Sequence, residues 1–164
     1  MALTEAEKQA LQEKKVKEAQ TILQTTLDFL NEENFHFEQT EDYEIHFTVK
    51  GDDLPMELYI NIDVDREVIR LFSVLPFKIN PDNYSLMAEG TVAINDHLVN
   101  GNFDLNKDHM MMSFRMAQTY RDSLISKSVI AYILYTSLNT MDDYNDKLFM
   151  LNKGKCTLDE LLAD

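Results

Sequence analysis

The spacing of the apolar residues changes twice along this chain, and these changes constrain the fold more than any other feature. Up to about residue 33 the chain contains neither Gly nor Pro, and between residues 16 and 30 its apolar residues recur at intervals of three and four. That period is typical of an amphipathic helix. Thr4 and Glu7 have the spacing of a capping box, which marks a helix start. We therefore predict a long helix over 1–33, whose first three turns project into solvent or meet a partner.

After this helix the apolar residues alternate with polar ones, which is the period of a strand with one buried face. Turn residues at Gly51-Asp52-Asp53 separate two such stretches, so antiparallel hairpins are the simplest topology. One stretch, 68–75, is apolar at both parities, and alternation alone does not assign its buried face. The strands are predicted over residues 35–37, 43–49, 56–64, 68–75, 103–105 and 110–116.

Three further helices are indicated by residues typical of helix ends. Asn80 is a suitable N-cap before Pro81, Gly154 is suited to follow a helix, and Thr157 and Glu160 form a second capping box. The helices are predicted over residues 81–97, from Asp122 or Ser123 to Leu151, and over 157–163. The fold class is therefore α+β: one domain over 1–164, an antiparallel sheet with helices on one face, in the order α-β-β-β-(β)-α-β-β-α.

The charge of the chain excludes several classes of partner. With 29 Asp and Glu against 15 Lys and Arg, the formal charge is −14, which opposes a phosphate backbone or an anionic membrane. The longest apolar run, Val129–Tyr135, is too short to cross a bilayer. A single cysteine, Cys156, rules out an intrachain disulfide, and no apolar signal peptide is visible at the N-terminus. We expect a cytoplasmic protein that binds neither nucleic acid nor membrane.

The sequence contains no motif for catalysis or metal binding that outweighs an ordinary structural interpretation. His36 and His46 fall on the outward parity of adjacent strands, where Glu38 and Glu44 would complete a divalent site, but exposed strand histidines are the favoured interpretation. Cys156 follows Lys155 before a helix, where its pKa would be lowered, but an incidental thiol is favoured. We predict no catalytic residues, no cofactor and no metal. Carboxylate pairs assembled in space stay open.

The C-terminal segment 149–162, FMLNKGKCTLDELL, ends one helix, breaks at Gly154-Lys155 and starts a short capped helix. This ending, with the element order, the size and the acidity, resembles the YbjN family and the wider type III secretion chaperone-like fold. The resemblance implies a homodimer without enzymatic activity that binds extended segments of client proteins or acts as a regulator. It carries over no site residues. The long, charged N-terminal helix departs from a compact secretion chaperone.

We therefore predict a non-enzymatic, dimeric chaperone-like or adaptor module that binds a segment of another protein. The alternatives are a ligand-sensing regulatory domain with a small molecule between helix and sheet, and a carboxylate- or metal-dependent enzyme. If Phe72 faces the core, then Ile69 and Leu71 face outward beside Tyr59. The predicted partner-binding residues are Tyr59, Ile69, Leu71 and His46. A competing hypothesis is that the dimer contact uses this patch.

Overall fold

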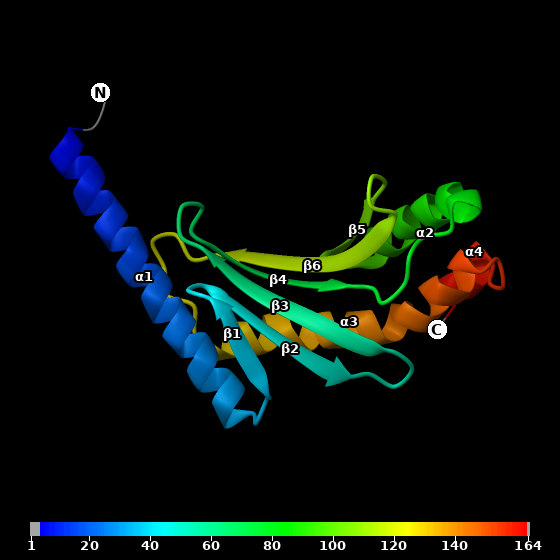
Figure 1. Ribbon diagram of the computed structural model, residues 1–164, viewed down its shortest axis with the longest axis horizontal. Helices are drawn as coiled ribbons and strands as arrows, with labels where there is room; N and C mark the ends of the chain where they lie inside the picture. Colours follow the sequence, from blue (N-terminus) through cyan, green and yellow to red (C-terminus); the bar gives the residue numbers. More distant parts are fainter. Residues whose placement is uncertain (1–3, 164) are drawn as a thin grey trace.

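The computed structural model describes residues 4–163 and consists of one antiparallel sheet and four α-helices (Figure 1). Met1–Leu3 and Asp164 lie outside the described residues. No helix in the described part of the chain is long and apolar enough to span a membrane. The elements are α1 (Glu5–Glu32), β1 (Phe37–Glu41), β2 (Glu44–Lys50), β3 (Pro55–Asp63), β4 (Val68–Val74), η1 (Pro81–Asn83), α2 (Tyr84–His97), β5 (Asn102–Asn106), β6 (Met111–Thr119), α3 (Lys127–Asn152) and α4 (Leu158–Leu161).

The N-terminal helix α1 starts at the predicted capping box. The Thr4 backbone N–H donates to Glu7 Oε2 at 2.8 Å, and the Glu7 N–H donates to Thr4 Oγ1 at 3.3 Å. The helix is exposed as far as Lys14, and its buried positions begin at Ala19. Its first turns extend away from the rest of the molecule, as predicted (Figure 1).

The sheet has six strands in the order β1-β2-β3-β4-β6-β5, and every neighbouring pair is antiparallel. Strands β1 to β4 form consecutive hairpins, as the turn residues predict. One parity of each central strand is buried: Ile45, Ile60, Leu71 and Met116 lie opposite one another across four strands and belong to the core. The helices α1 and α3 pack on this inner face, so the predicted α+β architecture is confirmed.

The connection from β4 to α2 is fixed by a buried amide of α3. Asn152 accepts the Asn80 N–H at Oδ1, 2.7 Å away, and donates from Nδ2 to the Lys78 carbonyl at 2.9 Å. Asn80 also accepts the Asp82 N–H, as expected of an N-cap. A 3-10 turn rather than α-helix follows Asn80, and α2 itself begins at Tyr84.

The long helix α3 begins at Lys127, later than the predicted start at Asp122 or Ser123. Asp122 has a left-handed backbone, with φ +54°, which does not fit a helix start. The segment before α3 is held by Tyr120, whose hydroxyl donates to the Asp63 carbonyl at 3.1 Å. The other end agrees with the prediction, because Gly154 follows the helix with φ +65°.

Candidate functional site

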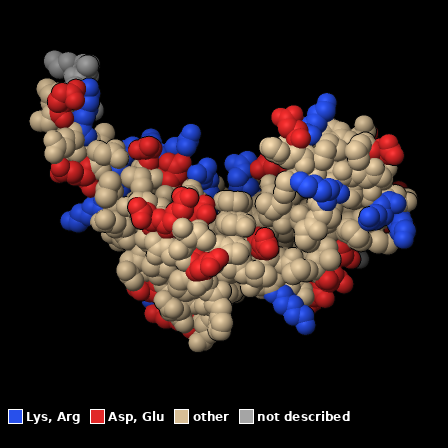
Figure 2. Space-filling model, viewed as in Figure 1, with Lys and Arg blue, Asp and Glu red and all other residues tan. Residues whose placement is uncertain are grey.

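The face of the sheet turned away from the helices, called here the outer face, is formed by the outward parity of the strands. Its side chains are partly or fully exposed, in contrast to the buried inner parity. Figure 2 shows acidic and basic side chains interspersed over the view that it presents. On the neighbouring strands β1, β2, β3, β4 and β6 the outer face includes Glu38, Glu44, His46, Thr48, Glu57, Tyr59, Asn61, Asp63, Val68, Arg70, Phe72, Val74, Ser113 and Arg115.

Three aromatic rings lie side by side across this face. His46, Tyr59 and Phe72 lie opposite one another in β2, β3 and β4. The rings of His46 and Tyr59 stack with centroids 4.6 Å apart, and those of Tyr59 and Phe72 with centroids 5.1 Å apart and an interplanar angle of 11°. Glu38 and Arg115 occupy the two ends of the same row. We call the three residues the aromatic file.

Of the four residues predicted to bind a partner, two lie on the outer face and two do not. His46 and Tyr59 lie together, but Ile69 and Leu71 are 1% and 0% exposed and face the core. Their outward placement is wrong because β4 is apolar at both parities and its inner face contains the polar, fully buried Ser73. The pairing with β3 decides the parity, which turns Phe72 outward. Phe72 is the residue that alternation alone missed.

Two arginines of the outer face, Arg70 and Arg115, are already bound within the chain. Arg70 donates to Asn61 Oδ1 at 2.7 Å and lies 3.3 Å from Asp63 Oδ2. Arg115 donates from Nε to Asp104 Oδ2 at 2.8 Å, and this hydrogen bond raises the pKa of the guanidinium. Around the aromatic file these arginines therefore contribute little uncompensated positive charge.

The carboxylates near β1–β3 are not compensated in the same way. Within the described residues, no Lys or Arg forms an ion pair with Glu38, Glu44 or Glu57. Glu38 Oε1 lies 3.1 Å from His46 Nδ1, and Glu44 accepts a hydrogen bond from Thr40 at 3.0 Å. This side of the outer face is therefore acidic.

A shallow hollow of about 420 Å³ adjoins the aromatic file on β1 and β2. Its lining includes His36, Glu38, His46 and Thr48, so it contains the two histidines considered as metal ligands. In the described part of the chain, no group of three or more His, Cys, Asp or Glu side chains is arranged to hold a metal ion. The polar groups of the hollow are the Glu38 carboxylate, the Thr48 hydroxyl and the imidazoles of His36 and His46.

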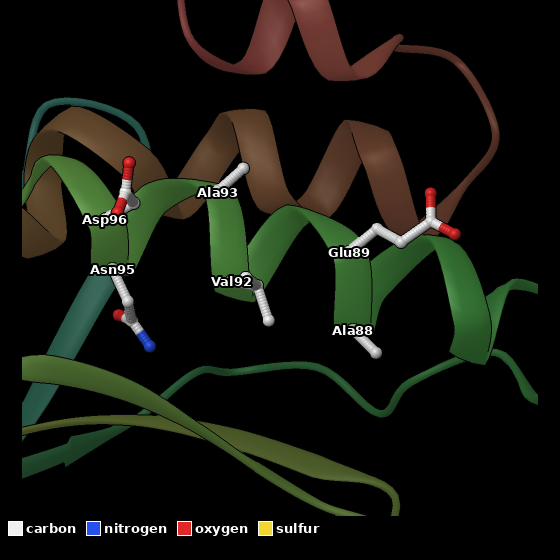
Figure 3. Close-up of a pocket in the computed structure, with 6 residues that line it drawn as sticks. All are labelled: Ala88, Glu89, Val92, Ala93, Asn95 and Asp96. Atoms are coloured by element: carbon white, nitrogen blue, oxygen red, sulfur yellow. The ribbon is translucent and has the colours of Figure 1, made fainter.

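A second exposed apolar surface lies on α2. A hollow of about 760 Å³ is lined by Ala88, Val92 and Ala93, with Glu89 and Asp96 beside them (Figure 3). Val92 is 71% exposed. Because these lining residues come from one helix, the hollow is an open surface and not an enclosed ligand cavity.

Cys156 does not show the activation considered from its sequence position. Burial raises the pKa of its thiol, and the nearby Glu160 raises it further. A thiol with a raised pKa is a poor nucleophile at neutral pH. A lowered pKa from the neighbouring Lys155 is not found, because burial and the carboxylates of Glu160 and Asp146 outweigh the one cation that lowers it, Lys147.

Comparisons with known proteins identify the fold. No protein-family model matches the chain, and no curated protein matches it by sequence. Solved structures do match, and three of them have a TM-score of 0.55 each. YbjN from E. coli, a proposed transcription regulator, is 12% identical over 73% of this chain and 85% of YbjN.

The other two structures are complexes of one protein with another. A chain of the HopA1–SchA chaperone–effector complex is 16% identical, over 77% of this chain and 92% of that one. A chain of the ExsC–ExsE complex is 9% identical, over 81% of this chain and 94% of that one. At these identities the likeness shows the fold, and it confirms the predicted type III secretion chaperone-like architecture.

Proposed function

We propose that this protein is a non-enzymatic, chaperone-like module whose outer face binds a segment of another protein. The observation that carries the proposal is the aromatic file, a row of stacked rings on a sheet face that no described helix covers. Clustered aromatic side chains at a surface are typical of protein-binding sites, where they supply contact area at a small cost in conformational entropy. The part of Tyr59 and Phe72 that stays exposed is available to such a partner.

The comparisons support the same class of function. One of the similar structures is a chaperone–effector complex, another is a complex of two proteins, and the third is a proposed transcription regulator. None of the three is described as an enzyme, which fits a binding role. On this proposal His46, Tyr59 and Phe72 form the contact, while Ile69 and Leu71 support it from the core.

Self-association through α2 is the second part of the proposal. The apolar stretch 68–75 offers little for a dimer contact, because Ile69 and Leu71 of β4 and Leu75 just after it are buried within one protomer. In α2, Ile94 is buried as well, whereas Val92 is exposed beside a hollow. We therefore assign the dimer contact to the outer side of α2, which leaves the outer face of the sheet for the partner.

The alternative function is a small-molecule sensor, in which the hollow on α2 would be the ligand site. Ligand sites usually enclose most of the surface of their ligand, and residues of a single helix do not provide walls on several sides. This geometry favours a protein contact. Native mass spectrometry of the purified protein checks the alternative, since a retained small molecule would support it.

Affinity purification from the cells of origin tests the proposed function. The wild type is compared with two variants. Phe72→Ser removes a ring from the aromatic file, and Val92→Lys places a charge on the exposed apolar surface of α2. We expect a stoichiometric partner with the wild type, its loss with Phe72→Ser and its retention with Val92→Lys. A partner that Phe72→Ser retains, or the absence of any stoichiometric partner, contradicts the proposal.

A further inference from the structure

We propose that the segment bound at the outer face carries basic side chains beside its apolar ones, and that one basic side chain enters the hollow next to His46. This inference rests on the proposed function, because it specifies the chemistry of the partner at the same face. An apolar strip, unbalanced carboxylates and the adjoining hollow support it independently of one another.

The apolar strip is the aromatic file itself. It crosses three strands, so it is about 10 Å long at the usual strand spacing. Because Tyr59 and Phe72 stack face to face, their faces are turned toward each other and their edges point outward. Val74 extends the strip on β4. A matching partner has to contribute apolar side chains over this length.

The unbalanced carboxylates flank the strip. Glu57 precedes Tyr59 by two positions and Glu44 precedes His46 by two, so each lies about 7 Å along its strand from a ring of the file. Glu38 lies at the end of the row. In the described residues of this half of the face, the outward cation is Lys50 at the end of β2. Charge complementarity therefore selects a basic partner segment.

The hollow provides a place for one basic group. Glu38 contributes to its lining beside His46, and only one oxygen of Glu38 is engaged by the imidazole. An arginine or lysine head group entering the hollow meets this carboxylate within hydrogen-bonding reach. The formal charge of −14 favours the same partner at long range.

Selection from a display library of random 12-residue peptides tests the inference. The immobilised baits are the wild type, the double variant Glu38→Gln/Glu57→Gln, the charge-matched control Glu5→Gln/Glu13→Gln on α1, and Phe72→Ser. Far-ultraviolet circular dichroism first establishes that each bait is folded. All glutamate substitutions are at exposed positions, so the fold is expected to persist.

We expect peptides selected on the wild type and on the α1 control to be enriched several-fold in Arg and Lys next to apolar residues. On Glu38→Gln/Glu57→Gln the basic enrichment should disappear while the apolar enrichment remains. A titration of one selected peptide should show at least a fivefold weaker affinity for that variant.

Basic enrichment that persists on Glu38→Gln/Glu57→Gln, or wild-type peptides that are neutral or acidic, would overturn the inference. In the second case, loss of those peptides on Phe72→Ser would still uphold the proposed function. If the wild type and Phe72→Ser select the same peptides, or neither selects any, both the inference and the proposed function fail at this face.

Discussion

Tyr59 and Phe72 lie opposite each other in β3 and β4, with their rings 11° from parallel and 5.1 Å apart, directly above a fully buried core. The residues on either side of Phe72, Leu71 and Ser73, are both 0% exposed. One step along β4 therefore separates a side chain that supports the fold from one that is available to a partner.

This alternation gives a prediction about stability. Leu71→Asp places a carboxylate among buried apolar side chains and should lower the free energy of unfolding by at least about 3 kcal/mol, enough to unfold a marginal domain. Phe72→Asp, its neighbour on the outer face, should cost about 1–2 kcal/mol, chiefly through the lost stack. Urea unfolding followed by circular dichroism measures both values. Equal losses for the two variants would contradict the assigned parity of β4.

A second prediction concerns two glycines with positive φ. Gly101 has φ +78°, and a Cβ there would overlap the buried ring of Phe114, so Gly101→Ala should destabilise the protein by about 2–4 kcal/mol. Gly154 has φ +65° but open space around it, the nearest atom to an added Cβ being 3.7 Å away. Gly154→Ala should therefore cost only about 1 kcal/mol, from the backbone alone. Thermal unfolding of the pair tests this order, and a reversal would show that the Phe114 contact is misplaced.

The sequence predicted most of this architecture because local signals agreed with tertiary packing. Thr4 with Glu7 marked the start of α1, and alternation gave the strands and the outward positions of His46 and Tyr59. Two failures share a cause in long-range structure. The pairing of β4 with β3 decides which side chains of β4 face the core. The polar Ser73 lies on that buried side, so the sequence pattern pointed to the wrong side. The start of α3 lies later than predicted because Asp122 has a left-handed backbone. The residue types around Asp122 do not reveal this conformation.

The pH dependence of stability should contain a contribution from Tyr120. Burial, together with the nearby Glu67 and Asp63, raises the pKa of its hydroxyl from 10.0 to about 12. The folded state thus holds this proton more tightly than the unfolded state. The resulting stabilisation is fully present below pH 10 and is lost as the pH rises toward about 12.

The variant Tyr120→Phe isolates that contribution. Between pH 9 and pH 12 the free energy of unfolding of the wild type should fall by about 2–3 kcal/mol more than that of Tyr120→Phe. This figure follows from the raised pKa of Tyr120, at about 1.4 kcal/mol for each unit of pKa difference between the folded and unfolded states. At neutral pH the variant should be less stable by about 1 kcal/mol, because the hydrogen bond to the Asp63 carbonyl is absent. Parallel pH curves for the two proteins would contradict the raised pKa.

Self-association should depend on α2. Light scattering of the wild type at micromolar concentration is expected to give twice the 19.1 kDa chain mass. Val92→Lys introduces a charge into the apolar surface and should yield a folded monomer. Leu124→Lys, at a loop position that is also 71% exposed, is the matched control and should stay dimeric. A monomeric wild type excludes the dimer, and a dimeric Val92→Lys places its contact elsewhere.

Site-specific photo-crosslinking tests the central claim, that the outer face of the sheet binds a segment of another protein. Benzoyl-phenylalanine replaces Phe72 in one variant and the equally aromatic but remote Tyr132 of α3, 48% exposed, in another. Irradiation in the cells of origin is followed by mass spectrometry of the adducts. The account predicts one dominant protein adduct at position 72, within a continuous stretch of a single partner, and no such adduct at position 132. The same partner peptides at both positions, or none at position 72, would contradict it.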